Sequence, residues 1–330
     1  MYILAFETSC DDTSVAVMRN DECISLSTRT QLEHSATGGV VPEVAARSHA
    51  NAIFPCIDDA LRDAGIHLSD IDLIACTDRP GLAPSLLTGL VVADTLAISL
   101  QKPILRIDHI ESHIFANLLE RSESDIIFPA VLLTVSGWHT ELYQWNSLFD
   151  LQMIGQTHDD AAGECFDKVS KMLGMGFPGG KKIADLAEKY TGIYEGMFPL
   201  VLLDRESLDF SFSGLKSAVK RYIDIQIATP EWLAPDKKIQ IAYEFEEVVT
   251  DILSKKLLRA AEQKNTKMIL LAGGVSANTK LKKKIQILAD TAYIPFLAPT
   301  RNIYSMDNAA MVGIRAYYEW KSNSVSVIPA

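Results

Sequence analysis

The chain has 330 residues, a length that fits roughly two domains. With 48% hydrophobic and 22% charged residues, its composition is that of a globular protein and excludes disorder as the main state. The formal net charge of −11 repels phosphate backbones on average, so nucleic-acid binding would need a local basic patch or a basic partner.

Cysteine usage and hydropathy indicate the compartment. Five cysteines are dispersed without any CxxC pair, which favours a reducing compartment and offers no thiolate zinc site. The first residues lack the basic region and cleavage site of a secretory signal. The longest apolar stretch, 85–100, is interrupted by Asp94 and is shorter than the ~20 residues that span a bilayer. These features predict a cytoplasmic protein that does not enter a membrane.

Two segments share one pattern. Residues 2–18 are expected to form a strand, a polar turn and a second strand, and residues 130–143 repeat this arrangement. A third apolar strand, 267–272, ends in Gly273-Gly274 before a helical segment, and an amphipathic helix is expected over 242–263.

The repetition predicts a duplicated α/β fold with a cleft between its halves, although two unrelated hairpins would give the same spacing. We place the halves at 1–127 and 128–330. The C-terminal helix is expected to pack back on the first half.

The spacing of two histidines is the sharpest chemical signal. In Asp108-His109-Ile110-Glu111-Ser112-His113, Asp108 has the residue type of a helix N-cap. The two imidazoles lie one helical turn apart, with ~5–6 Å between their Cβ atoms, so both can bind one ion. Asp307, a lone acid in a small and apolar run, is the best candidate for a remote third ligand. The same pattern also fits a solvent-facing or structural pair of histidines.

Glu111 argues against a protease. Because it follows His109 by two residues, it points ~200° around the helix, away from the face that carries both histidines. In zinc proteases with the HExxH motif, the glutamate lies beside the metal-bound water. A metalloprotease is therefore disfavoured.

Glycine turns suited to phosphate binding occur at Ser136-Gly137, Gly179-Gly180 and Gly273-Gly274, because glycine lets backbone N–H groups approach an anion closely. Each alone is also typical of an ordinary turn. The sequence contains neither GxxxxGK[ST] nor GxGxxG, so the fingerprints of P-loop and Rossmann sites are missing.

Two acidic groups have an open role. Asp11 and Asp12 lie in the first turn and could orient a metal, a water or an amine, or could simply be solvated. The segment 159–168 is dense in acids and could be a ribose clamp or merely the start of a helix.

Taken in order, these motifs resemble one family, the tRNA threonylcarbamoyladenosine transferases (TsaD, formerly called O-sialoglycoprotein endopeptidases). The resemblance covers nearly the whole chain and implies an α/β fold of the duplicated actin/Hsp70/sugar-kinase-like (ASKHA) type with a central interdomain cleft. The matching segments are Phe6–Thr13, Gly38–Glu43, His109–His113, Val135–Gly137 with His139-Thr140, Asp159–Glu164 with Phe166–Lys168, Phe177–Gly180, Asp209–Lys216, Ala272–Asn278 and Asp307–Met311.

The resemblance also implies the roles of residues. His109, His113 and Asp307 would hold one iron or zinc ion, and Asp11 and Asp12 would orient or deprotonate an amine. The implied reaction transfers a threonylcarbamoyl group from threonylcarbamoyl-AMP to the N6 amine of the adenosine 3′ of the anticodon, in tRNAs that read codons starting with A. The residues that match the family's binding positions for that intermediate are Thr134, Val135, Ser136, Gly137, Trp138, Asp167, Gly180 and Asn278.

Several positions depart from the family pattern, and two of them bear most on the geometry of ligand binding. Trp138 replaces the second glycine of the usual Ser-Gly-Gly-His, and Arg79 replaces the first glycine of Gly-Pro-Gly-Leu. They leave open a divergent, non-catalytic paralogue that binds nucleotide or a partner protein, whereas the histidine pair disfavours a kinase of the same superfamily. For an active enzyme, the resemblance implies tRNA as substrate, and a TsaB-like paralogue and a TsaE-like ATPase as partners.

Overall fold

The computed structural model describes residues 1–31, 34, 39–200, 206–227 and 234–322. It divides into two compact units, Met1–Asp125 with Pro299–Ala330, and Ile126–Ala298. Each unit is built on one five-stranded sheet.

The sheet of the first unit is hydrogen-bonded in the order β3-β2-β1-β4-β5. β1 pairs antiparallel with β2 and parallel with β4, while β2–β3 is antiparallel and β4–β5 is parallel. These strands are β1 (Tyr2–Glu7), β2 (Asp12–Arg19), β3 (Glu22–Thr30), β4 (Leu73–Arg79) and β5 (Ile104–Asp108).

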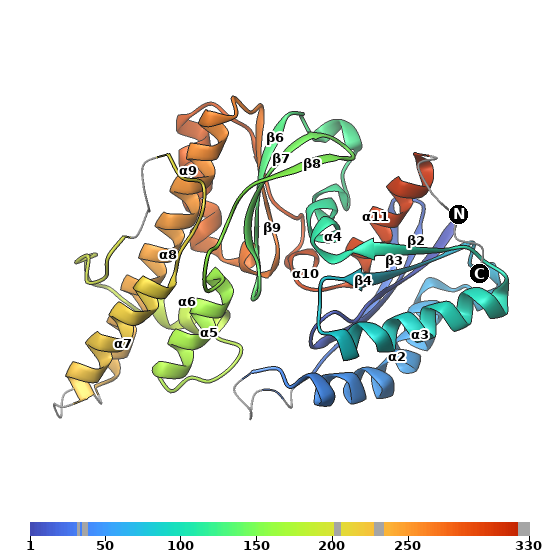
Figure 1. The fold of residues 1–330 in the computed structure, drawn as a ribbon, viewed down its shortest axis with the longest axis horizontal. Helices are drawn as coiled ribbons and strands as arrows, with labels where there is room; N and C mark the ends of the chain where they lie inside the picture. The colour runs from blue at the N-terminus through green and yellow to red at the C-terminus, as the bar shows by residue number, and fades with distance from the viewer. Residues whose placement is uncertain (32–33, 35–38, 201–205, 228–233, 323–330) are drawn as a thin grey trace. The chain divides into compact units, whose positions relative to one another are not determined.

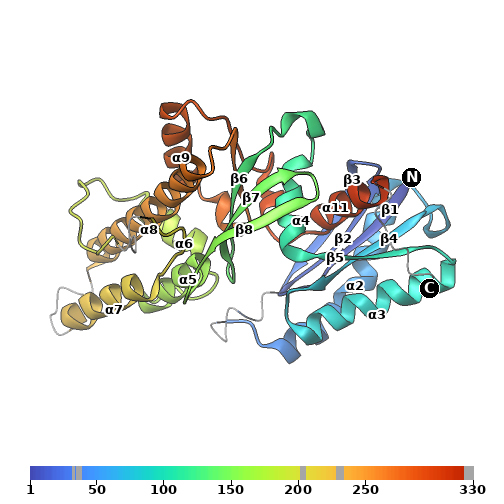
Figure 2. The same ribbon diagram turned by 45° about the horizontal axis from the view of Figure 1, so that its top comes forward.

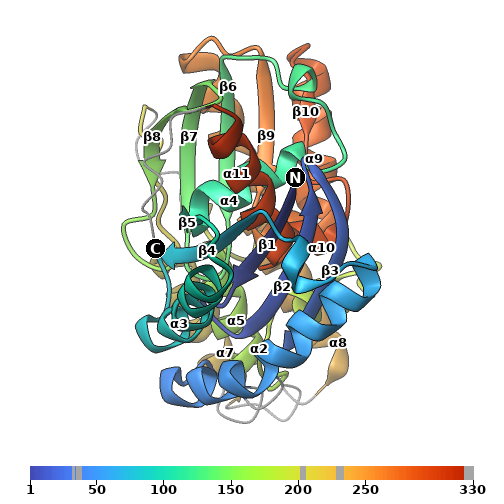
Figure 3. The same cartoon turned by 90° about the vertical axis from the view of Figure 1, so that its right-hand side faces the viewer.

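Helices cover both faces of this sheet (Figures 2 and 3). Leu4 and Phe6 of β1 pack in a core with α2 (Pro42–Ala64) and α3 (Ala83–Leu100). Ala5 points to the other face, where α11 (Ala309–Lys321) comes so close that a Cβ on Gly313 would lie 3.4 Å from the Ala5 Cβ. With both faces buried, β1 reads as a nearly continuous apolar run.

Helix α3 is the one helix in the described part of the chain that is long and apolar enough to cross a membrane, judged by its length and composition alone. It packs against α2 and β4. Its Asp94, the charge that interrupts the apolar stretch, is 2.6 Å from the guanidinium of Arg106 on β5.

The sheet of the second unit is hydrogen-bonded in the order β10-β9-β6-β7-β8. β6 pairs antiparallel with β7 and parallel with β9, β7–β8 is antiparallel, and β9–β10 is parallel. If the strands of each unit are numbered from one along the chain, both sheets have the order 3-2-1-4-5 with the same orientations. The predicted duplication requires this match. They are β6 (Ala130–Val135), β7 (Thr140–Ser147), β8 (Asp150–Gln156), β9 (Met268–Ala272) and β10 (Phe296–Leu297).

Helices of the second unit share one large apolar core with β6, β7 and β9. The longest of them, α8, lies alongside α9 (Figure 1). It begins at Pro235, earlier than the helix expected over 242–263, because a proline at the first helical position needs no N–H partner. The helices are α5 (Ala162–Met172), α6 (Gly180–Ala187), α7 (Ser213–Ile227), α8 (Pro235–Gln263) and α9 (Thr279–Thr291).

Short helices complete the two units. In the first unit they are α4 (His109–Phe115), α10 (Asn302–Ser305) and the 3-10 turns η1 (Leu68–Asp70), η2 (Ala116–Leu118) and η3 (Glu123–Asp125), and in the second η5 (Gly274–Ala277).

Candidate functional site

The two histidines lie on α4, which begins where the sequence predicts. The Asp108 side chain accepts hydrogen bonds from the backbone N–H groups of Ile110 at 2.8 Å and Glu111 at 3.1 Å, and so caps the helix. His109 and His113 are therefore one turn apart, both are buried, and their ring centroids are 4.7 Å apart.

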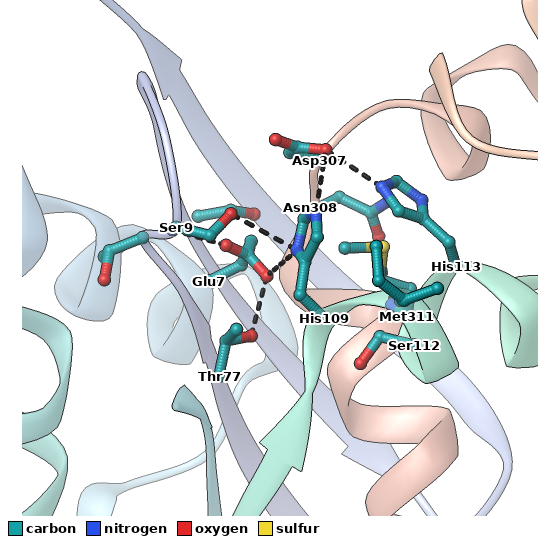
Figure 4. Close-up of polar contacts among 12 residues, drawn as sticks. Glu7, Ser9, Thr77, His109, Ser112, His113, Asp307, Asn308 and Met311 are labelled. Atoms are coloured by element: carbon teal, nitrogen blue, oxygen red, sulfur yellow. Dashed lines mark hydrogen bonds and ion pairs between the residues drawn. The ribbon is translucent and has the colours of Figure 1, made fainter. Parts of the chain in front are cut away.

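Asp307 reaches both imidazoles (Figure 4). Its Oδ1 lies 3.1 Å from Nε2 of His113 and 3.7 Å from Nε2 of His109. One donor atom from each of the three residues fits within 4.8 Å of the others. The remote acid chosen from sequence thus meets both histidines, although it follows His113 by 194 positions.

Asn308, the residue after Asp307, fixes the backbone that carries the Asp307 carboxylate. Asn308 caps α11 by accepting from the N–H of Met311, and its amide donates to the carbonyl oxygens of Ile303 and Met306. Since these bonds fix the residues on both sides of Asp307, the carboxylate is presented by a rigid helix start.

Glu7 is the residue of this cluster that the sequence did not single out. Its Oε2 is 3.0 Å from Nδ1 of His109, on the side of the ring opposite the Asp307 carboxylate (Figure 4). Burial alone would lower the pKa of His109, but the Glu7 and Asp307 carboxylates outweigh it and raise that pKa to about 9. The one signal that could have pointed to Glu7 is its place as an acidic residue at the end of an apolar, buried strand, because a buried charge requires a partner.

This donor set fits a transition-metal ion. Two imidazole nitrogens and one carboxylate oxygen are ligands that both zinc and ferrous iron accept, and such a three-residue set leaves coordination positions for substrate or water.

Asp11 and Asp12 lie in the same unit but outside the three-residue cluster. Asp12 is the first residue of β2 rather than part of the turn, and its Oδ1 accepts a hydrogen bond from the hydroxyl of Thr30. Burial, with a smaller contribution from the Asp307 charge, raises the pKa of Asp12 to about 7. Burial also raises the pKa of Asp11. Both therefore hold protons more tightly than ordinary aspartates.

Glu111 does not face the cluster. Its carboxylate lies 2.8 Å from the Arg315 guanidinium of α11, which also lies 4.9 Å from the centre of the Phe115 ring. Glu111 therefore fastens α4 to α11, as its predicted orientation away from the histidines implies.

The predicted nucleotide-binding residues all lie in the second unit, and all but Asp167, which lies within α5, are at or beside the ends of its strands and helices. The Ser136 N–H donates to the carbonyl oxygen of His139, and its hydroxyl oxygen accepts from the N–H groups of Trp138 and His139. The turn after β6 is thus held by its own serine. Gly137 has open space where a side chain would begin.

Two other backbone segments pack closely against the end of β6. A Cβ on Gly163, at the start of α5, would lie 2.4 Å from the Ser136 oxygen, and a Cβ on Gly273 would lie 2.4 Å from the Val135 oxygen. Gly273 also has φ +83°, which only glycine adopts readily. Thr134 at the end of β6 has a buried hydroxyl without a hydrogen-bond partner in the described part of the chain.

The side chains of Asp167 and Asn278 accept hydrogen bonds from backbone N–H groups and so fix the backbone around them. The Asp167 carboxylate accepts from the N–H of Gly179 at 2.6 Å and so fixes the turn that leads into Gly180 and α6. Asn278 caps α9 by accepting from the N–H of Leu281, and its amide donates to Glu246 at 2.7 Å. Two helices, α6 and α9, thus begin at turns that these residues fix, and helix N-termini favour anions.

The acid-rich segment 159–168 has a structural role. Asp159 accepts from the backbone of Phe212 and Ser213 at the start of α7, and Asp160 pairs with Lys168 and Lys216. These contacts favour the helix-start interpretation over a ribose clamp.

The two departures from the family pattern have different surroundings. Arg79 is exposed, and its guanidinium lies 3.1 Å from Asp78 and 3.7 Å from Asp108, so it pairs with half-buried carboxylates. Trp138 is 61% exposed and lies at the turn after β6, among the predicted nucleotide-binding residues.

Comparisons with known proteins identify the sequence family. Residues 22–314 match the sequence model of TsaD, described as tRNA N6-adenosine threonylcarbamoyltransferase. A protein of that name from Bdellovibrio bacteriovorus is 41% identical over 94% of this chain and 90% of its own length. Another, from Staphylococcus haemolyticus, is 42% identical over 97% of this chain and 92% of its own length.

Solved structures of distant sequence share the fold. HypF from T. kodakarensis superposes with a TM-score of 0.61 at 13% identity, over 99% of this chain and 48% of that one. The activator of the 2-hydroxyisocaproyl-CoA dehydratase from Clostridium difficile gives 0.54 at 13% identity over the whole of both chains. These likenesses confirm the predicted ASKHA fold.

Proposed function

The chain belongs to the tRNA N6-adenosine threonylcarbamoyltransferase family, and from that premise we propose that it is a metal-dependent enzyme that uses threonylcarbamoyl-AMP as donor. Threonylcarbamoyl transfer onto tRNA is the activity of this family, and the non-catalytic paralogue is not favoured. The observation that carries the metal dependence is the convergence of His109, His113 and Asp307 within 4.8 Å.

The reaction is an acyl transfer. The N6 amine of the target adenosine attacks the carbonyl carbon of the mixed anhydride, a C–N bond forms, the C–O bond to the phosphate breaks, and AMP leaves. His109, His113 and Asp307 hold the metal ion, which when bound supplies Lewis acidity. The amine loses a proton, and Asp12, whose pKa is about 7, is suited to accept it at neutral pH, with Asp11 orienting the amine.

The second unit binds the donor's nucleotide. The turn Ser136–Trp138, the Gly179-Gly180 turn fixed by Asp167 and the start of α9 at Asn278 present backbone N–H groups and helix N-termini, which suit a phosphate. Thr134 and Val135, at the end of β6, complete this set of binding residues.

Iron or zinc is the expected metal, and the cytoplasm is the expected place of work, because tRNA is the substrate. From the family resemblance we infer that a TsaB-like paralogue and a TsaE-like ATPase act with the chain. Its net charge of −11, which suits it poorly to bind a polyanion alone, supports a need for partners.

The test is transfer of labelled threonine from threonylcarbamoyl-AMP to unmodified tRNA, with the metal-loaded chain and both partners present. We expect modified tRNA and AMP in equal amounts, and loss of both in the Asp12→Asn variant. Failure of the loaded chain to form modified tRNA with all components supplied would overturn the proposed activity.

A further inference from the structure

Glu7 is a fully buried carboxylate at the end of β1. Its Oε1 accepts a hydrogen bond from the Ser9 N–H at 2.6 Å, and its Oε2 accepts one from the Thr77 hydroxyl at 2.6 Å. The third contact of the carboxylate is Nδ1 of His109, 3.0 Å from Oε2 (Figure 4). A buried carboxylate is stable only when such donors surround it.

These contacts assign the proton on the His109 ring. An ionised carboxylate only accepts hydrogen bonds, so the Nδ1 that faces Glu7 must carry a hydrogen. The other ring nitrogen, Nε2, is the one on the Asp307 side. The carboxylate therefore fixes both the orientation of the ring and the nitrogen that is presented to a cation.

The two histidines differ in this respect. Nδ1 of His113 is buried and has no hydrogen-bond partner among the described residues, so no carboxylate holds a hydrogen at that nitrogen. Glu7 acts on His109 alone.

We propose that Glu7 is a positioning residue of the metal centre, which accepts a hydrogen bond from Nδ1–H of His109 and so directs Nε2 to the ion. This inference rests on the proposed function of the histidine cluster. Carboxylates that orient ligating histidines in this way raise metal affinity about 10–100-fold.

Replacing Glu7 with glutamine reverses the direction of the hydrogen bond between residue 7 and Nδ1 of His109. The Ser9 N–H can only donate, so the glutamine oxygen must face it, and the NH₂ group then faces His109 and Thr77. The Thr77 hydroxyl can rotate to accept, but His109 can accept at Nδ1 only by moving its hydrogen to Nε2. That hydrogen blocks the nitrogen needed by the ion.

The experiment uses the full chain labelled with ¹⁵N-histidine, with Zn²⁺ as the probe. In the Zn²⁺-loaded protein we expect long-range ¹H–¹⁵N spectra to show His109 protonated at Nδ1 and bound through Nε2. In the Glu7→Gln variant we expect the tautomer to switch and chelator competition to show a Zn²⁺ affinity lower by about 10–100-fold. Ser9→Ala is the matched control, since it removes the hydroxyl 3.2 Å from the same Nδ1 but keeps Glu7, and its affinity should stay close to the unmodified chain.

Coordination of Zn²⁺ through Nδ1 of His109 in the unmodified chain would overturn the inference, whether or not Glu7→Gln folds. So would a folded Glu7→Gln variant that keeps the original tautomer and affinity. A purely structural Glu7 would lower the melting temperature without either change. Zn²⁺ binding that is indifferent to His109→Ala would instead refute the metal site itself, and the transfer assay tests the activity separately.

Discussion

The Asp307 carboxylate approaches Nε2 of both His109 and His113, so removal of either imidazole takes away one of three converging donors. We expect the purified chain to carry about one transition-metal ion, and His109→Ala or His113→Ala to lose tight binding and transfer activity while remaining folded. Because binding displaces a proton from His109, whose pKa is about 9, affinity should rise with pH toward that value.

Elemental analysis of the isolated variants measures this loss. His158→Ala is the matched control, since that histidine is exposed and pairs with Asp209 in the second unit, and it should keep its metal. Full occupancy in a variant that lacks both His109 and His113 would contradict the site.

The raised pKa of Asp12 predicts that the stability of the folded state depends on pH. Its folded pKa of about 7 lies above the ordinary value of 3.8, so ionisation destabilises the folded state. That cost is fully present above about pH 7 and disappears as the pH falls toward about 4. Asp12→Asn, which keeps an oxygen for the Thr30 hydroxyl, should therefore raise the melting temperature of the metal-free protein at about pH 8 and leave it unchanged at about pH 4. An equal effect at both values would show that the carboxyl is not perturbed.

Trp138 is exposed at the turn after β6, where an indole can stack on a base. We expect Trp138→Gly to weaken binding of threonylcarbamoyl-AMP by about 1–3 kcal/mol in calorimetry. Tyr293→Ala, at an aromatic 94% exposed in the same unit, is the control. A gain in affinity for Trp138→Gly would show that the indole obstructs the nucleotide, and an unchanged affinity that it points away.

At the scale of elements, α4 and α11 are joined by the ion pairs of Arg315. The Arg315 side chain is 12% exposed, and its guanidinium reaches Glu111 at 2.8 Å and Glu319 at 2.6 Å. α4 carries both histidines, and Asp307 lies just before α11. The ion pair between Arg315 and Glu111, called here the Arg315 clamp, therefore keeps the three donors together.

Arg315→Met keeps an unbranched side chain but removes the guanidinium that pairs with Glu111 and lies over Phe115. It should therefore destabilise the fold by about 1–3 kcal/mol and lower metal affinity. Thermal unfolding and chelator competition measure the two effects. Arg19→Met, which breaks an exposed pair with Glu22, should change neither the stability nor the metal affinity measurably. A loss of stability with full metal affinity would show that the clamp does not position the ligands.

Local patterns were sufficient where one element carries the signal. The strands of both hairpins, the Asp108 cap and the orientation of Glu111 follow from short-range periodicity and side-chain type. Glu7 and Thr77 were missed because their role exists only once β1 and β4 pair. Thr77 then donates to Glu7, and Glu7 lies against His109, 102 positions away in the sequence. Propensity and spacing carry no information about such pairing.

For the whole molecule, the sequence predicted the duplication from one repeated hairpin, and the matched order of the two sheets confirms it. The return of residues 299–322 to the first unit brings Asp307 to the histidines, and it depends on α11 packing across β1 and β2. The family resemblance pointed to Asp307 more firmly than the residues alone, because no local pattern encodes a contact of that sequence separation.

The charge of the chain bears on how it handles tRNA. With 31 basic and 42 acidic residues, the chain needs a local cluster of basic residues to bind phosphates. Several lysines of the second unit are engaged in ion pairs within that unit. Lys181 pairs with Asp185, Lys216 with Asp160, Lys220 with Asp224, and Lys280 and Lys284 with Glu247. Each such pair leaves less positive charge for a phosphate.

We therefore expect the isolated chain to bind tRNA weakly, with an affinity that falls steeply as salt rises, and to turn over little until a paralogous partner docks. Fluorescence anisotropy across a salt series measures the first effect, because the slope of log affinity against log salt counts the phosphates contacted. Lys220→Glu removes a basic group and leaves Asp224 unpaired. It should weaken tRNA binding further if the surface around Lys220 contacts the tRNA. Single-component transfer with the adenylate supplied measures the second. Robust multiple turnover by the lone chain would refute the need for a partner, and tight, salt-insensitive binding would refute the electrostatic argument.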